Sequence, residues 1–403
     1  MQTTDVVIIG AGPAGLSAAI ECRENDLEVT VIDEFPSAGG RLLGQLHQEP
    51  DGEWWNGVKE TKILVDKAEE YNTIIKCGIS VHHIETLDEG YTVHTNKEKI
   101  TAKNILIATG AAEIAAPIPG WTLPGVMSIG AAQVMTNVHR VSVGEKGVVV
   151  GVNVLSAAIA RELQIAGTEL HSMALPAKNV VSEDQAHPQK VMERLVRIAH
   201  LAPSKFIQFG SKFAKASFVR NLAVKFFPKG GVKMWGMPIH VRKAISKING
   251  TDKVESVTMV DVTVDGEIIP GTEQDISVDF VCIAGGLYPL AELAAAMGLP
   301  FEYSEELGGH VPLHNEAMET SLEGVYVAGN ITGIESAKVA RAQGKVAGLS
   351  IVKNNNKANV DSKIADAIQE VKDTREAASI QFHPNIEQGR NNISNSFQKA
   401  TQN

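Results

Sequence analysis

The sequence predicts an α/β fold in which one Rossmann-like domain is inserted into another. A strand–glycine–helix unit opens the chain at residues 5–33, and residues 146–174 hold an imperfect copy of it. Apolar strands at 278–286 and 324–330 then lead back toward the first domain. We therefore expect the first domain, a parallel sheet with a β-meander, at 1–118 and 280–352. The inserted domain is expected at 119–279, with a hairpin turn at 249–250. A polar tail should follow at 353–403, with one helix near 361–376 and a mobile end from Asn391.

The first unit has the order of a dinucleotide site: an apolar strand, three glycines, a helix and a second strand that ends in an acid. Gly10, Gly12 and Gly15 match G-x-G-x-x-G. In that motif the first glycine permits the tight turn, the second lets a pyrophosphate approach the backbone, and the third lets helix and strand pack closely. The start of the helix offers N–H groups to the phosphates. Asp33, or its neighbour Glu34, is placed to bind the ribose hydroxyls.

Three further segments favour FAD over NAD as the dinucleotide. They are the paired glycines at 37–41, the strand at 105–110 that ends in Ala-Thr-Gly, and the strand at 324–330 that ends in Gly-Asn. These segments resemble the FAD domain of the two-dinucleotide-domain flavoproteins, a group that includes glutathione and thioredoxin reductases. The resemblance implies that Asn330 replaces an aspartate that holds a ribityl hydroxyl, and that helix 334–344 points its N-terminus at the flavin ring. The expected FAD-binding residues are Gly10, Gly12, Pro13, Ala14, Gly15, Asp33, Glu34, Gly40, Arg41, Val81, Ala108, Thr109, Gly110, Gly329, Asn330, Ser336 and Ala337.

The inserted domain keeps the outline of an NAD(P)H site but alters its chemistry. In the turn that begins at Gly151, Asn153 occupies the second glycine position and Ser156 the third. The strand at 169–174 also ends without an acid for a ribose. A side chain at position 153 points where a pyrophosphate should approach, so NAD(P)H is the disfavoured second cofactor.

A basic segment at 186–235 departs from the acidic balance of the chain. Between His187 and Trp235 the sequence has ten Lys or Arg residues and a single acid, Glu193. Phe206, Phe209 and Phe213 follow helical spacing there. Three interpretations stay open: a solvated helical lid, a docking surface for an acidic electron carrier or a dehydrogenase subunit, and a membrane-surface contact.

Composition narrows the function classes. The 403 residues carry a net charge of −10, which gives no support to a nucleic-acid role. The three cysteines, Cys22, Cys77 and Cys282, form no C-x-x-C pair, so we expect no redox dithiol and no metal site. Neither a signal peptide nor a membrane span is predicted, and we expect a cytoplasmic protein.

A narrower resemblance rests on the segments at 31–40 and 119–127. They are similar to the D-E-x-P-x-x-G-G and P-G-W-T-L-P-G-V segments of the α subunits of amino-acid dehydrogenases, opine oxidases and hydrogen cyanide synthase. This resemblance implies a flavin-bearing subunit of a hetero-oligomer that oxidises an amino or imino acid (proline, hydroxyproline, sarcosine or an opine) by hydride transfer to flavin N5. The tail lacks the cysteine cluster that many of those subunits carry. A stand-alone NAD(P)H-dependent reductase and a non-catalytic relay subunit are the alternatives. No catalytic residue is identified, because His47, Trp54 and Trp55 are better explained as structural.

Overall fold

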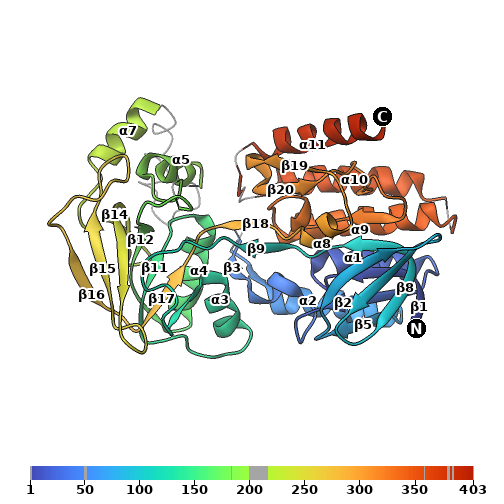
Figure 1. Ribbon diagram of the computed structural model, residues 1–403, viewed down its shortest axis with the longest axis horizontal. Helices are drawn as coiled ribbons and strands as arrows, with labels where there is room; N and C mark the ends of the chain where they lie inside the picture. Colours follow the sequence, from blue (N-terminus) through green and yellow to red (C-terminus); the bar gives the residue numbers. More distant parts are fainter. Residues whose placement is uncertain are drawn as a thin grey trace. The chain divides into compact units, whose positions relative to one another are not determined.

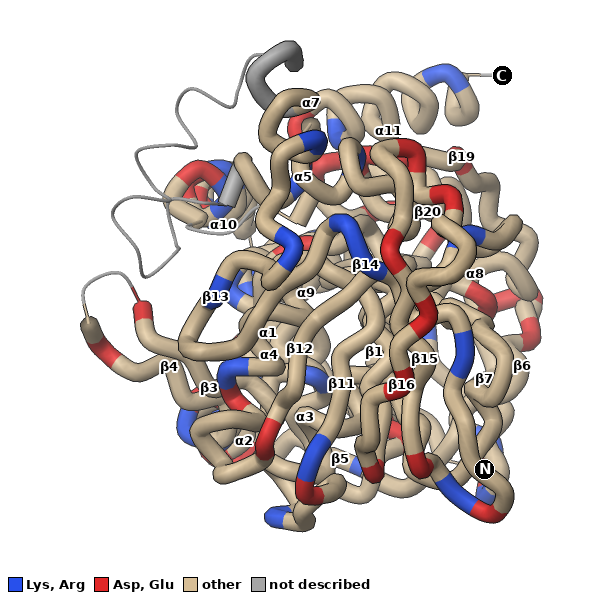
Figure 2. Tube along the Cα trace, turned by 90° about the vertical axis from the view of Figure 1, so that its left-hand side faces the viewer, with Lys and Arg blue, Asp and Glu red and all other residues tan. Residues whose placement is uncertain are grey.

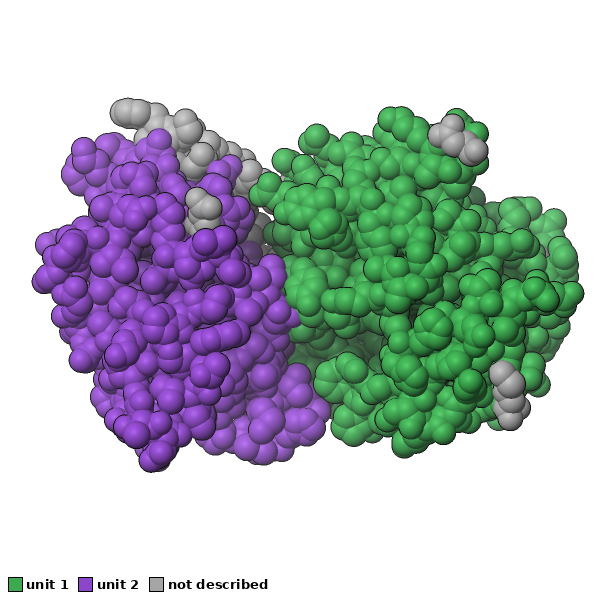
Figure 3. Space-filling view, in the orientation of Figure 1, with its two compact units in different colours: residues 1–112, 287–403 green, residues 113–286 purple. Residues whose placement is uncertain are grey.

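The computed structural model describes residues 2–49, 52–182, 184–198, 217–357, 359–378, 382–383 and 385–402. The chain forms two compact units, Met1–Ala112 with Leu287–Asn403, and Glu113–Gly286 (Figure 3). The predicted α/β fold with an inserted second domain is confirmed. The boundaries differ from the expected 118 and 280, because Ala116, Ile118 and strand 280–283 belong to the hydrophobic core of the second unit.

The first unit is built on a seven-stranded sheet, seen at the N-terminal, blue end of Figure 1. The strands β5, β2, β1 and β8 lie side by side and run parallel, and β21 pairs with the end of β8. The antiparallel strands β7 and β6 continue the sheet beyond β8 as the expected meander. The bounds are β1 Gln2–Ile9, β2 Val29–Asp33, β5 Ile74–Cys77, β6 Val81–Thr86, β7 Tyr91–Thr95, β8 Lys99–Ile107 and β21 Val325–Val327.

Two helices that are far apart in the sequence pack closely in this unit, α1 (Pro13–Glu24) and α9 (Ala337–Asn354). Small residues make the contact possible. A Cβ at Gly344 would lie 2.0 Å from the Ala14 carbonyl oxygen, and one at Gly348 would lie 2.7 Å from the Ala18 carbonyl oxygen. Because the contacts advance by four residues on both helices, α1 and α9 run in the same direction. Their first turns therefore lie on one side of the unit.

Shorter elements complete the first unit. They are η1 Gly40–Gly44, β3 Leu46–Gln48, β4 Trp54–Asn56, α2 Gly57–Glu70, β18 Leu287–Pro289, α8 Glu292–Ala296, β19 Phe301–Ser304, η3 Glu305–Leu307, β20 Gly309–Pro312, η4 Asn330–Thr332 and β9 Ala111–Glu113, whose last residue begins the second unit. Strand β9 pairs with β18, β3 with β4, and β19 with β20.

The C-terminal segment differs from the polar tail that the sequence predicts. It forms two helices, α10 (Asp361–Glu376) and α11 (Ile386–Thr401), the orange and red elements of Figure 1. Helix α10 lies where one was expected and packs on α9. Helix α11 covers residues that were expected to be mobile. Its Ile386 and Ile393 are buried against Leu307, Val311 and Leu313, and this apolar contact orders the segment.

The second unit holds an eight-stranded sheet in the order β10, β17, β11, β12, β14, β15, β16, with β13 beside β14. The first five strands of that order are parallel, and the predicted hairpin is formed by β14 and β15. The bounds are β10 Val126–Ser128, α3 Ile129–Asn137, β11 Lys146–Val150, α4 Val154–Ile165, β12 Glu169–Pro176, α5 Pro188–Ile198, α7 Ser217–Lys225, β13 Val232–Met234, β14 Met237–Asn249, β15 Ser256–Asp261, β16 Gln274–Ser277 and β17 Phe280–Ile283.

The basic segment is partly neutralised by an acid that precedes it. Asp184 forms ion pairs with Lys190 and Arg194, both on α5. Figure 2 shows further basic positions near α7 and β13. The expected row of Phe206, Phe209 and Phe213 lies outside the described residues. In the part of the chain that is described, no helix is long and apolar enough to cross a membrane, and no group of His, Cys, Asp or Glu has the arrangement of a metal site.

Candidate functional site

The glycine turn between β1 and α1 is packed so tightly that only glycine fits two of its positions. Gly10 has a φ of +110°, and a Cβ there would lie 2.3 Å from the Ala108 carbonyl oxygen. A Cβ at Gly15 would lie 1.9 Å from the Gly10 carbonyl oxygen. The absence of a side chain at both positions lets the start of α1 approach the ends of β1 and β8 this closely. The structure thus brings Gly10, Gly15 and Ala108 together.

Gly12 has the opposite environment, since a Cβ at this position would meet no described atom within 4 Å. It is the N-cap residue of α1, no side chain caps the helix, and its first turn holds no acid. The second glycine segment approaches from the side, with a Cβ at Gly40 only 3.4 Å from the Gly12 Cα. Open space therefore lies over the positive end of a helix dipole, between two glycine backbones.

Asp33, at the end of β2, binds the glycine turn itself. One carboxylate oxygen accepts the Ala11 N–H at 2.7 Å, and the other accepts the Phe35 N–H at 2.9 Å. Burial raises the pKa of Asp33, and these two hydrogen bonds offset only part of that rise. A carboxylate has about four acceptor positions, so ribose hydroxyls could still be bound here. The alternative acid, Glu34, is exposed to solvent.

Several other predicted residues hold the backbone around this turn. The Thr109 hydroxyl donates to the Leu290 carbonyl at 2.5 Å, and the Gly110 carbonyl accepts the Leu290 N–H at 3.0 Å. Arg41 donates from Nε to the Ala111 carbonyl at 3.0 Å. Val81 begins β6, two residues after Ile79, whose N–H donates to the Asp33 carbonyl at 3.0 Å.

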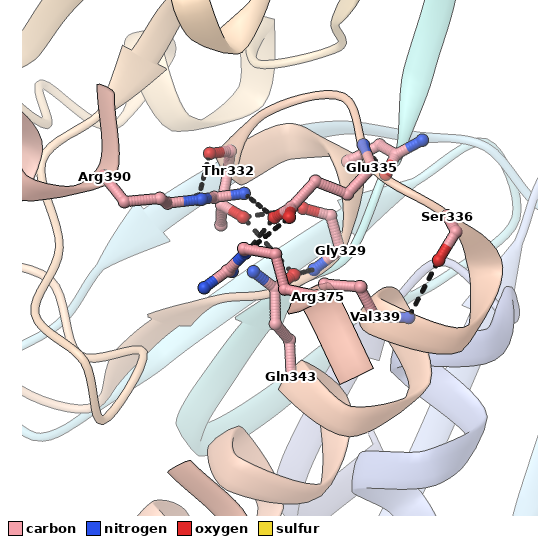
Figure 4. Close-up of polar contacts among 9 residues, drawn as sticks. Gly329, Thr332, Glu335, Ser336, Val339, Gln343, Arg375 and Arg390 are labelled. Carbon is pink, nitrogen blue, oxygen red and sulfur yellow. Dashed lines mark hydrogen bonds and ion pairs between the residues drawn. The ribbon is translucent and has the colours of Figure 1, made fainter. Parts of the chain in front are cut away.

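The segment from Gly329 to Ala337 leads into α9 and is held at several points (Figure 4). The Gly329 N–H donates to Gln343 Oε1 at 3.0 Å. Asn330 Oδ1 accepts the Glu335 N–H at 3.2 Å, which folds the loop between them. Ser336 caps α9 by accepting the Val339 N–H at 3.3 Å. Asn330 and Ser336 thus shape the loop whose end carries Ala337.

A cavity of about 310 Å³ joins the first turns of the two helices. It is lined by Pro13 of α1 and by Ala337, Lys338 and Arg341 of α9, together with Leu42 and Trp55. Lys338 Nζ lies 4.8 Å from the centre of the Trp55 ring, a cation–π distance. Pro13 and Ala337, which are 324 residues apart in the sequence, therefore contribute to one hollow.

His47, Trp54 and Trp55 differ in their surroundings. Trp55 lines the cavity and donates from Nε1 to Gln45 Oε1 at 3.1 Å. His47 lies 3.3 Å from Glu49, which also pairs with Lys338 at 2.9 Å. Burial lowers the pKa of His47, and the carboxylate of Glu49 opposes that shift. Trp54 is exposed.

The inserted unit has the corresponding turn, but its helix start is closed. Asn153 is the N-cap of α4 and accepts the Ser156 N–H at 2.9 Å, while the Ser156 hydroxyl accepts the Asn153 N–H at 2.9 Å. The Asn153 amide also donates to the Ala284 carbonyl at 3.2 Å. A side-chain capping box therefore fills the space that a phosphate would take on α1.

Sequence reasoning missed four residues of this region. Glu335, Gln343, Arg375 and Arg390 form a buried polar cluster around the loop before α9. Glu335 directly precedes the predicted Ser336, and its position could have suggested a role. The two arginines lie in the segment expected to be a polar tail, so no local pattern marks them.

The residues of the first unit fit FAD on structural grounds. Gly12 leaves a cradle that a Cβ would fill, the start of α1 has no side-chain cap, and Asp33 supplies a carboxylate at the end of β2. A dinucleotide pyrophosphate needs this donor set and this space. Gly12, Gly40 and Asp33 would hold its adenosine and phosphate part, and Asn330 and Ala337 its flavin part.

Comparison with known proteins agrees with this geometry. The pyridine nucleotide-disulphide oxidoreductase model matches residues 4–217 and 218–344. An opine oxidase subunit of Agrobacterium tumefaciens (strain Ach5) is 26% identical over 362 residues, which is 86% of this chain and 65% of that protein. The HcnB subunit of hydrogen cyanide synthase from Pseudomonas protegens is 23% identical over 86% of this chain and 70% of its own length. The chain thus spans slightly under two thirds of the opine oxidase protein.

Solved structures show the same fold. L-proline dehydrogenase from P. horikoshii has a TM-score of 0.65 and 21% identity, and covers 91% of this chain and 59% of its own. Thioredoxin reductase from T. acidophilum has a TM-score of 0.61 and 21% identity, and covers 88% of this chain and 100% of its own. The resemblances found in the sequence are confirmed. The chain belongs to the pyridine nucleotide-disulphide oxidoreductase family.

Proposed function

We propose that this chain is the flavin-bearing, α-type subunit of an assembly that dehydrogenates an amino or imino acid. The substrate class is proline, hydroxyproline, sarcosine or an opine. Relatives named as subunits of opine oxidase and hydrogen cyanide synthase support the proposal. The alpha subunit of a Corynebacterium sarcosine oxidase, which is 22% identical over 86% of this chain and 32% of its own length, adds further support.

One observation carries the proposal: the chain holds two similar helix starts, and only one is open. Gly12 leaves the start of α1 uncapped, whereas Asn153 and Ser156 satisfy the start of α4 with their own side chains. A self-sufficient NAD(P)H reductase needs both starts to bind a pyrophosphate. The capping box therefore disfavours a nicotinamide donor and favours a small organic substrate.

The residues of the first unit have distinct roles in this function. The start of α1 binds the pyrophosphate through its dipole, Asp33 fixes the turn and offers its remaining acceptor positions to a ribose, and Asn330 folds the loop before α9. The first turn of α9 places the positive end of its helix dipole beside the cavity that Ala337 lines. When bound, FAD supplies a hydride acceptor at N5.

The partners belong to the same proposal. A dehydrogenase β subunit or an acidic electron carrier would dock on the basic segment at 186–235. Lys225, Lys229 and Lys233 follow the two basic residues that Asp184 neutralises, and Lys229 and Lys233 are exposed. Electrostatic docking of this kind weakens with added salt.

Purification of the chain under native conditions tests the proposal. We expect a yellow protein with stoichiometric FAD whose absorbance near 450 nm, the usual flavin band, is unchanged by NADH or NADPH. A proline, sarcosine or opine substrate should bleach this absorbance when the β-type subunit is present. Rapid bleaching by NADH in the isolated chain would overturn the proposal and support a stand-alone reductase. Absence of bleaching by these substrates in both preparations would also overturn the proposal.

A further inference from the structure

The C-terminal helices reach the loop that leads into α9 through a buried group of three charges. Arg375 of α10 contacts both carboxylate oxygens of Glu335, from Nε at 2.5 Å and from its terminal nitrogen at 3.0 Å. Arg390 of α11 contacts the second of these oxygens at 2.5 Å. Figure 4 shows both guanidinium groups converging on this one carboxylate. The Glu335 side chain is only 5% exposed, so solvent screens these contacts weakly.

Arg390 also holds the other end of the same loop. It donates to the Thr332 carbonyl, and the Thr332 hydroxyl donates to the Gly329 carbonyl at 2.8 Å. Gly333, with a φ of +128°, makes room for this approach, since a Cβ there would lie 3.1 Å from the Arg390 guanidinium. The loop is thus tied at Thr332 and at Glu335, on either side of a glycine.

The same loop is held from within its own unit by α9. Gln343 accepts the Gly329 N–H at 3.0 Å through Oε1, and its buried side-chain nitrogen has no hydrogen-bond partner among the described residues. Gln343 is 1% exposed. The loop between Gly329 and Ser336 is therefore fixed by one residue from each of α9, α10 and α11. A binding site needs supporting residues of this kind to hold its geometry.

We propose that Glu335, Arg375 and Arg390 form a clamp that positions the flavin-binding loop at 329–337, so that the C-terminal helices are part of the FAD site. This inference rests on the proposed function in one respect, the binding of FAD by the first unit. The three side chains are positioning residues, and they act through the loop and through the first turn of α9. Two guanidinium groups against one carboxylate also leave a net positive charge beside that turn.

The clamp has a measurable consequence for FAD binding. Glu335→Gln removes the charge that both arginines share and loosens the loop at its α9 end. Since the loop must then be ordered when FAD binds, we expect the dissociation constant for FAD to rise about tenfold or more. The reduction potential of the bound flavin should become more positive, because the charge of the two guanidinium groups is no longer offset.

Glu162→Gln is the matched control. Glu162 is also a buried carboxylate, but it belongs to the second unit, where it accepts from Gln133 at 2.8 Å and from Asn137 at 2.6 Å. The variant Glu162→Gln should lower the melting temperature while leaving the affinity for FAD unchanged. Arg375→Lys is the milder second variant, because it keeps the charge and loses the two-pronged contact. It should give an intermediate loss of affinity and can be measured if Glu335→Gln does not fold.

The experiment uses the full chain stripped of flavin and titrated with FAD, with protein fluorescence, melting temperature and flavin potential as readouts. A clamp predicts that the rise in melting temperature on adding FAD shrinks in Glu335→Gln and Arg375→Lys but not in Glu162→Gln. The inference is overturned if the clamp variants keep the dissociation constant and the flavin potential of the unmodified chain. Failure of the unmodified chain to bind FAD would instead refute the proposed function.

Discussion

Replacement of Gly12 by alanine separates the stability of the glycine turn from its capacity to bind a phosphate. The backbone at Gly12 has a φ of −76°, which any residue can adopt, and a Cβ there would meet no described atom within 4 Å. The neighbouring Gly15 is its matched control, since a Cβ at that position would lie 1.9 Å from the Gly10 carbonyl oxygen. The two substitutions add the same methyl group to the same turn.

The expected magnitudes follow from these surroundings. At Gly12, alanine is a poorer N-cap than glycine, but it also reduces the entropy of the unfolded chain, so the free energy of unfolding should change by less than about 0.5 kcal/mol. At Gly15 the overlap should cost about 3 kcal/mol or more. Binding of FAD should respond in the opposite way. A methyl group at Gly12 displaces the pyrophosphate from the N–H groups of α1, and hydrogen bonds to charged groups contribute about 1.5–3 kcal/mol each.

Urea unfolding of the flavin-free chain and FAD titration by fluorescence measure the two effects. Gly12→Ala should keep the urea midpoint and weaken FAD binding by about 100-fold or more, the equivalent of about 3 kcal/mol. Gly15→Ala should lower the midpoint before any FAD is added. Unchanged FAD affinity in Gly12→Ala would refute the assignment of the pyrophosphate to this helix start. A large loss of stability in the same variant would refute the view that this space is open.

Three further predictions follow from individual contacts. Gly344→Ala should lower the free energy of unfolding by about 2 kcal/mol, because its Cβ would lie 2.0 Å from the Ala14 carbonyl oxygen. An unchanged melting temperature would contradict the close packing of α1 on α9. Burial and the nearby Arg390 lower the pKa of His314 to about 4. Between this pKa and the pKa of about 6.5 that His314 has in the unfolded chain, the unfolded state binds more protons, so the free energy of unfolding should fall by about 3 kcal/mol as the pH drops from 6.5 to 4. The urea midpoint of His314→Gln should fall less steeply over this range than that of the unmodified chain. Parallel falls in the two proteins would contradict the role of His314. Asn153→Gly should lower the free energy of unfolding by only a few tenths of a kcal/mol, yet the second unit should bind ADP more tightly than in the unmodified chain, as measured by calorimetry. Equal ADP affinity in the two proteins would show that the capping box does not block that site.

The amino-acid sequence by itself determined the two Rossmann-like units and predicted the position of the first nucleotide site. Gly10, Gly12 and Gly15 are within one turn and its helix, and the strands on either side are short apolar runs. Such features depend on residues that are neighbours in the chain, so their spacing is visible without a fold. The substitution of Asn153 for a glycine was equally visible, and the structure added the hydrogen bonds by which it closes the start of α4.

Only the tertiary structure decided the extent of each unit and the role of the C-terminal segment. Strand β17 joins the sheet of the second unit because its neighbours there are β10 and β11, from residues 126–150. Glu335 meets Arg375 across 40 residues and Arg390 across 55, and neither arginine lies in a motif. Contacts between residues so far apart are set by how α10 and α11 pack, and that packing comes from buried side chains such as Ile393 rather than from any local pattern.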